Sequence, residues 1–137
     1  MDDLIRIGRV STVNYKAGTA KVVYKDRDDM VTGELPMLSS EYLMPKPDDM
    51  VLVLHLKNAP SRGVIVGPIY NDDNRPGING KNKYCKDLTD DVKFKADGGN
   101  FTVKASGKVT IDADSIVFKG SSGTATLAQI ISHITSH

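Results

Sequence analysis

The sequence predicts an all-β protein with a small N-terminal barrel, a repeat of short strands and a short C-terminal helix. Three observations support this fold class. In the first half of the chain, apolar and polar residues alternate in runs that end at Gly, Pro or Asp. In the second half, short alternating runs are separated by turn residues such as Gly, Asp and Ser. Only the last residues change to the spacing of a helix.

The composition limits the class of protein. With 39% hydrophobic and 26% charged residues, the 137-residue chain is not expected to be disordered throughout. Its net charge of +1 lacks the field of a dedicated nucleic-acid or anionic-membrane binder, and its single cysteine excludes an internal disulfide framework. The acidic start and the lack of a long apolar run predict a protein made in the cytoplasm without an export signal or a membrane span.

A change in composition predicts two modules. All five Met lie in the first 50 residues, whereas all three Phe lie after residue 90. The polar segment 74–83, which contains Pro and Gly, separates the two compositions. We therefore expect a barrel domain at 1–75, a linker at 76–90, a strand repeat at 91–120 and a helical tip at 121–137.

The first module has the pattern of a closed sheet. Five apolar or alternating runs predict strands, at 5–15, 20–25, 30–38, 51–54 and 63–67. Pro36 fits the end of a strand better than the centre of a sheet. A small barrel of the OB type follows, because closure removes exposed strand edges.

The second module predicts an apolar face that its own chain cannot cover. Its strands are expected at 92–96, 101–105, 109–113 and 116–119. One side of them carries Val92, Phe94, Phe101, Val103, Val109, Ile111, Ile116 and Phe118. Such a face would aggregate in water, and copies arranged around an axis would bury all the faces together. The sequence thus predicts an obligate homo-oligomer.

The C-terminal residues predict a helix that continues the same axis. Thr126 and Gln129 have the spacing of a capping box. The apolar residues that follow form one stripe, made of Leu127, Ile130, Ile131 and Ile134. A helix this short is not stable alone in water, so we expect the stripe to join the oligomer core as a small bundle.

One run of residues resembles a known family. Residues 61–76, with the run R-G-V-I-V-G-P-I-Y-N and a proline shortly after it, resemble the end of the OB domain in phage baseplate assembly protein V. The spike proteins of type VI secretion have the same pattern. The segments 7–10, 26–30 and 50–54 are similar to the same family, and the resemblance extends to about Gly120.

The resemblance implies an OB-fold barrel followed by an intertwined trimeric β-helix or β-prism. The implied function is that of a homotrimeric central spike at the tip of a contractile tail, in a virion, a tailocin or a related injection particle. Such a spike caps the tail tube and pierces the target cell envelope when the sheath contracts. Its partners would be baseplate hub and tail-tube proteins and, in some particles, a separate tip protein. This function is mechanical, so no enzyme activity and no catalytic residue is expected.

Two histidines at the end of the chain are the candidate metal ligands. His133 and His137 are four residues apart, which places both imidazoles on one face of a helix. Three copies would supply six imidazoles, enough for an octahedral transition-metal ion on the trimer axis. Some members of the family hold a metal with His-x-His pairs, and this chain departs from that spacing. The alternative is a pair of solvated histidines, and no other cofactor is expected.

Most of the remaining polar residues are expected to be structural, and one group of them indicates an alternative function. His55 and Cys85 have no catalytic partner nearby in the sequence, and the five Asp-Asp pairs fall at turns and ends. One basic and aromatic strip is typical of OB folds that bind nucleic acid, and it consists of Lys16, Lys21, Tyr24, Lys25 and Arg27. The alternative function is therefore an OB-fold module for nucleic acid or carbohydrate with an oligomerisation tail. Acidic residues interleaved with the strip oppose this alternative.

Overall fold

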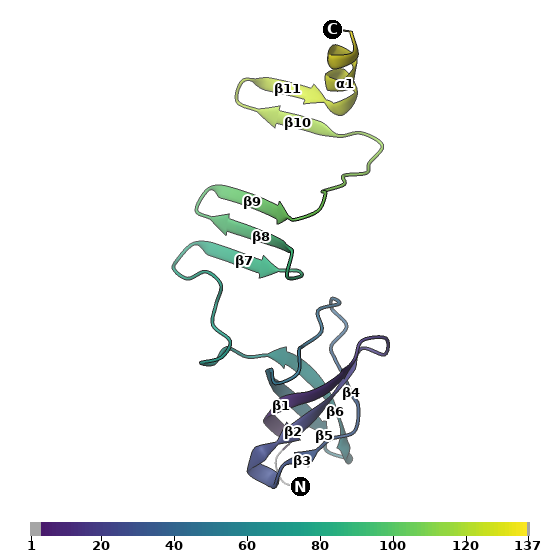
Figure 1. Ribbon diagram of the computed structural model, residues 1–137, viewed down its shortest axis with the longest axis vertical. Helices are drawn as coiled ribbons and strands as arrows, with labels where there is room; N and C mark the ends of the chain where they lie inside the picture. Colours follow the sequence, from purple (N-terminus) through teal and green to yellow (C-terminus); the bar gives the residue numbers. More distant parts are fainter. Residues whose placement is uncertain (1–3, 137) are drawn as a thin grey trace.

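The computed structural model describes residues 4–136 and shows a long, narrow chain with a barrel-like sheet at one end and a helix at the other (Figure 1). Strands dominate the structure, in three sheets, and the one α-helix is short and C-terminal. The predicted all-β class is confirmed at this level. Within the described residues no helix has the length and apolar character needed to cross a membrane.

The N-terminal sheet closes on itself. Its elements are β1 (Ile5–Asn14), β2 (Thr19–Tyr24), the 3-10 helix η1 (Lys25–Arg27), β3 (Met30–Val31), β4 (Leu35–Pro36), β5 (Met50–Leu56) and β6 (Ala59–Pro68). The strand order is β3-β2-β1-β5-β6, and β4 also pairs with β2. A parallel bridge joins Met37, just after β4, to Ile65 of β6, and the Leu38 amide donates to the Ile65 carbonyl at 3.2 Å. Pairing therefore continues around the ring from β2 through β4 to β6.

Alternate residues of these strands fill the interior. The buried apolar residues come from β1, β2, β4, β5 and β6, and they are Val10, Ala20, Val22, Tyr24, Leu35, Val51, Val53 and Ile65. Gly8 lets β1 pass close to this core, because a Cβ atom there would lie 2.4 Å from Cγ1 of Val22. Since such a contact is far below van der Waals distance, any larger residue would displace β1 or β2.

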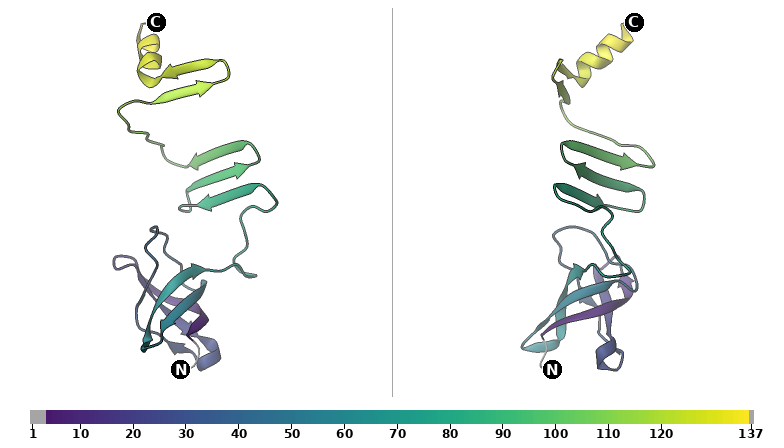
Figure 2. Two further views of the ribbon diagram at one scale, coloured as in Figure 1. Left: turned by 180° about the vertical axis from the view of Figure 1, so that it is seen from behind. Right: turned by 90° about the vertical axis from the view of Figure 1, so that its left-hand side faces the viewer.

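The second half of the chain forms two separate small sheets followed by the helix. The elements are β7 (Lys83–Asp87), β8 (Val92–Asp97), β9 (Asn100–Ala105), β10 (Val117–Gly120), β11 (Gly123–Thr126) and α1 (Leu127–Thr135). Strands β7, β8 and β9 make one antiparallel sheet, and β10 and β11 make a hairpin. Figure 2 shows both sheets stacked along the long axis beyond the barrel.

Two expectations for this half are corrected. Residues 83–87, placed in the predicted linker, form β7, which pairs with β8 along its whole length. The alternation in this segment was too poor in apolar residues to be recognised as a strand. Residues 109–113, predicted as a strand, are not a strand in the single chain. Their alternating pattern is that of a strand, but no other segment of residues 4–136 pairs with them.

Two ion pairs attach the three-stranded sheet to the barrel. Lys46 Nζ lies 3.3 Å from Asp90 Oδ1, and Lys86 contacts Glu41. The hydrogen bond to Glu41 raises the pKa of Lys86. Exposed pairs of this kind contribute little to stability, so the junction between the two parts is held weakly within one chain.

Candidate oligomer interface

One face of the sheet β7–β8–β9 is mostly apolar, with Lys86 as its charged member on β7, and the strand register places its residues side by side. Phe94 is opposite Val103, and Ala96 is opposite Phe101, in the β8–β9 pair. Residues opposite each other in antiparallel strands project to the same side. The Phe94 and Phe101 rings are in contact, with centroids 6.0 Å apart. The predicted grouping of these residues on one face therefore agrees with the register.

This apolar face is uncovered in the single chain. Phe101 is 66% exposed and Val103 is 44% exposed. The opposite face of the sheet carries charged and polar residues, including Lys93, Lys95 and Lys104. A three-stranded sheet with one apolar face needs a second layer to be stable, and the described chain supplies none.

The segment that follows β9 is exposed and has no backbone partner. Val109 is 60% exposed and Ile111 is 64% exposed. Within residues 4–136, none of the backbone groups of residues 107–115 makes a hydrogen bond to another backbone group. Its apolar side chains extend the set predicted for the oligomer core, but no strand of the described residues pairs with the segment.

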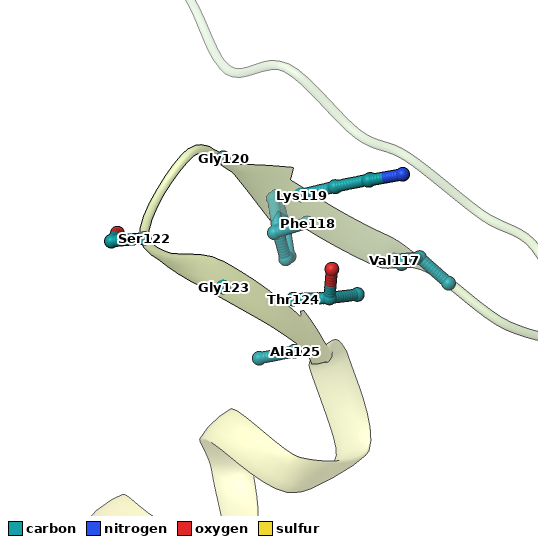
Figure 3. A pocket seen from close by; sticks show the side chains of 8 residues that line it. All are labelled: Val117, Phe118, Lys119, Gly120, Ser122, Gly123, Thr124 and Ala125. Carbon is teal, nitrogen blue, oxygen red and sulfur yellow. The ribbon is translucent and has the colours of Figure 1, made fainter.

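The hairpin β10–β11 also has an exposed apolar side. Phe118 is opposite Ala125 on one side of the hairpin, and Lys119 is opposite Thr124 on the other. Figure 3 shows a shallow pocket lined entirely by hairpin residues, with the Phe118 ring on one side and Lys119 extending away from it. Phe118 is 50% exposed. Because a two-stranded hairpin is at best marginally stable alone, this surface also needs a neighbour.

The helix α1 begins with the predicted capping box. The Gln129 amide donates to Oγ1 of Thr126 at 3.2 Å, and the Thr126 amide donates to Oε1 of Gln129 at 2.8 Å. This prediction is confirmed. None of the helix residues is buried, and Ile131 and Ile134 of the apolar stripe are 51% and 66% exposed. The helix thus has a capped N-terminus, but within residues 4–136 no other element buries its apolar stripe.

The structure adds one aromatic residue to this surface. Tyr84 of β7 is opposite Ala96 of β8, so it belongs to the same face as Phe94 and Phe101, and it is 53% exposed. It was missed because residues 76–90 were interpreted as a linker. The alternation of Tyr84 and Lys86 with Cys85 was the only signal for it in the sequence.

The structure describes only one of the two candidate metal ligands. His133 lies in the last turn of α1, whereas His137 lies outside the described residues. Across residues 4–136, no group of three or more His, Cys, Asp or Glu side chains is arranged to hold a metal ion. The tip site thus stays a prediction that depends on other copies of the chain and on His137.

The buried His55 of the barrel is held by hydrogen bonds through both of its ring nitrogens. His55 Nδ1 lies 3.3 Å from the Arg62 carbonyl oxygen, which can only accept, so Nδ1 carries the proton. His55 Nε2 then accepts from the Tyr24 hydroxyl at 2.6 Å. The Arg6 guanidinium packs over the Tyr24 ring, 4.3 Å from its centroid, and donates to Asp26 at 3.0 Å. Burial raises the pKa of Tyr24 to about 12, although the nearby Arg6 charge opposes the shift.

This arrangement weakens the case for a nucleic-acid strip. Tyr24 is the only aromatic residue of the predicted strip, and its side chain is fully buried at 0% exposure. Binding of single strands by OB folds depends on exposed rings that stack on bases. The remaining members of the strip are basic residues interspersed with Asp26, Asp28 and Asp29, which offer charge of both signs and no ring for stacking.

The other candidate residues lie at turns or in a strand. Asp28, Asp29 and Asp48 have positive φ angles of 56°, 57° and 74°. Asp is one of the few residues other than Gly that adopt this conformation readily, which accounts for these acidic residues by backbone geometry. Cys85 lies in the middle of β7, half-buried, with its Sγ 3.9 Å from Oδ1 of Asp87.

Comparison with known proteins adds no family to these observations. No protein-family model matches the chain, and no curated protein matches it. The surface described above is therefore interpreted from its own geometry, together with the sequence resemblance.

Proposed function

We propose that this chain forms the homotrimeric central spike of a contractile tail, in a phage, a tailocin or a related injection particle. The barrel would be an OB fold, and β7 to α1 would form an intertwined trimeric β-helix or prism that ends in a short helical tip. In the assembled particle the spike caps the tail tube and pierces the target envelope when the sheath contracts. Baseplate hub and tail-tube proteins are its expected partners, and the function requires no catalytic residue.

The observation that carries this proposal is the uncovered apolar surface that extends from β7 to α1. The elements that carry it follow one another along the long axis (Figure 2), and within residues 4–136 their apolar residues Phe101, Val109, Ile111, Phe118 and Ile134 are exposed. Three copies would bury these surfaces against one another around a common axis. A rod in which every strand is held by other chains resists unfolding under load, because one chain cannot separate without disrupting all three.

The ring of pairing in the N-terminal sheet supports the OB barrel, since β2 is joined to β6 through β4 and Met37. The barrel is filled by its own side chains. It is therefore suited to be the rigid base that the hub holds, while the narrow part of the molecule points away from it (Figure 1). The resemblance of residues 61–76 to baseplate spike proteins favours the same assignment.

Two experiments test the proposal. Light scattering or native mass spectrometry should give about three times 14.9 kDa for the purified full-length chain. Antibodies against the chain, labelled with gold, should decorate the baseplate tip of contractile tail particles purified from the producing cells. A stable monomer, or label along the sheath instead of at the tip, would contradict the spike. Salt-dependent binding to single-stranded nucleic acid would favour the alternative OB-fold binding module.

A further inference from the structure

The segment between β9 and β10 has the alternating pattern of a strand, with apolar residues on one side and polar residues on the other. Val109, Ile111 and Ala113 alternate with polar residues, which are Lys108, Thr110, Asp112 and Asp114. The segment is exposed and makes no backbone hydrogen bond within the described chain. A segment with this alternation normally pairs on at least one edge, because pairing satisfies its backbone groups and buries its apolar side.

The strand edges on either side of this segment are also unpaired. Strand β9 pairs only with β8, and β10 pairs only with β11, so each has one free edge in the described chain. The connection between them curves to one side and lies beside neither strand (Figure 1). Free edges with exposed apolar neighbours are the usual places where another chain adds a strand.

The polar side of β9 has an excess of positive charge at its free edge. Lys104 of β9 is directly opposite Lys93 of β8, and like charges in this position repel. Lys93 lies 4.0 Å from Asp87, whereas Lys104 has no acidic partner within residues 4–136. In the unpaired segment, Asp112 and Asp114 likewise have no basic partner in the described structure. The two sets of charges are complementary.

We infer that residues 107–116 of one copy add as a strand to the free edge of β9 in a neighbouring copy, with Asp112 paired to Lys104. This inference rests on the proposed trimer and specifies how its chains interlock. With the added strand parallel to β9, this pairing places Val109 opposite Phe101 and Ile111 opposite Val103 on the apolar face. It would also give the backbone of the segment the hydrogen bonds that its own chain does not provide.

The charges would also fix the register of this pairing. A slip of one residue would turn Asp112 onto the apolar face, so only shifts by an even number of residues keep the face apolar. A register that brings either Asp112 or Asp114 to Lys104 relieves the repulsion between Lys104 and Lys93. The register with Asp112 at Lys104 also sets Ile111 opposite Val103, where the register with Asp114 would set only Ala113. The charges and the apolar side chains together therefore select one alignment.

A charge swap in the full-length chain tests the pair. We expect Asp112→Lys to lower the melting temperature of the trimer by several degrees, because it places a third positive charge beside Lys104 and Lys93 at three equivalent sites. Lys104→Glu should lower it less, because the new carboxylate repels Asp112 but attracts Lys93. The double variant Lys104→Glu/Asp112→Lys should recover most of the loss. Lys57→Glu, at the β5–β6 turn of the barrel, is the control for the change in net charge, and it should leave the melting temperature unchanged. Losses in the double variant that equal the sum of the single losses would overturn the inference.

Amide hydrogen exchange of the unmodified protein tests the strand pairing itself. Because residues 107–115 make no backbone hydrogen bond within the part of the chain that the structure describes, slow exchange there indicates pairing with another copy. We expect protection of this segment in the trimer, at a level similar to β8. Fast exchange of the segment in an intact trimer would refute the inference and leave the spike assignment standing. A monomeric mass would refute the spike assignment itself.

Discussion

Replacing Phe101 with aspartate is the most direct test of the shared apolar core. In the single chain Phe101 keeps 66% of its surface exposed. For a ring that buries roughly 200 Å², this corresponds to about 130 Å² removed from water in the assembly, or about 3 kcal/mol per chain at about 25 cal/mol per Å². Three chains would lose about 10 kcal/mol, and each would also place an unpaired carboxylate in a dry interior, at a cost of several kcal/mol more. The variant should therefore fail to form trimers.

The assay for this prediction is the solution mass, measured together with far-UV circular dichroism to confirm that the barrel is folded. Thr102→Asp is the matched control, because it introduces the same residue at the next position of β9 on the polar face, opposite Lys95. We expect the control to remain a trimer of unchanged melting temperature. If Phe101→Asp also stays a trimer of normal stability, or if both variants fall apart alike, then the apolar face of β8–β9 is not the interface.

The remaining predictions concern the barrel and the helix cap. Gly8→Ala should destabilise the barrel by about 1–3 kcal/mol in urea unfolding, because the new methyl group would overlap Val22 and force β1 away. Unchanged stability would show that β1 and β2 can move apart without loss of stability, which would contradict the close contact at Gly8. The pKa of Tyr24 is raised from 10.0 to about 12 in the folded barrel, so the unfolded chain releases that proton first and stability should fall as the pH rises from about 10 to about 12. Tyr24→Phe should flatten that alkaline loss in a melting series against pH, and an equally steep loss in the variant would assign it to other groups. Thr126→Ala removes the side-chain acceptor for the Gln129 amide and should cost about 1 kcal/mol at the tip, measured as faster amide exchange in the helix. Ser122→Ala, at an exposed position in the β10–β11 turn, is the control and should leave the exchange of the helix unchanged.

The sequence determined the local structure wherever short-range patterns control it. The alternation in β8 and β9 specified both strands and the residues of their apolar face, because side chains on a strand change sides at every residue. The Thr126 and Gln129 spacing specified the start of the helix, since both hydrogen bonds of the capping box lie within one turn. The uncovered face was also predictable, because no segment of the chain had the length and apolar pattern to cover it.

Tertiary structure decided what depends on partners far apart in the sequence. Strand β7 was missed because its residues become a strand only through pairing with β8. Residues 109–113 were predicted as a strand, although the described part of the chain offers them no neighbour. The partnership of Tyr24 with His55 and Arg6 could not be foreseen either, because it joins three strands across the barrel. A strand needs a hydrogen-bonding neighbour as well as a suitable pattern, and the location of that neighbour, in the same chain or in another, is a property of the whole assembly.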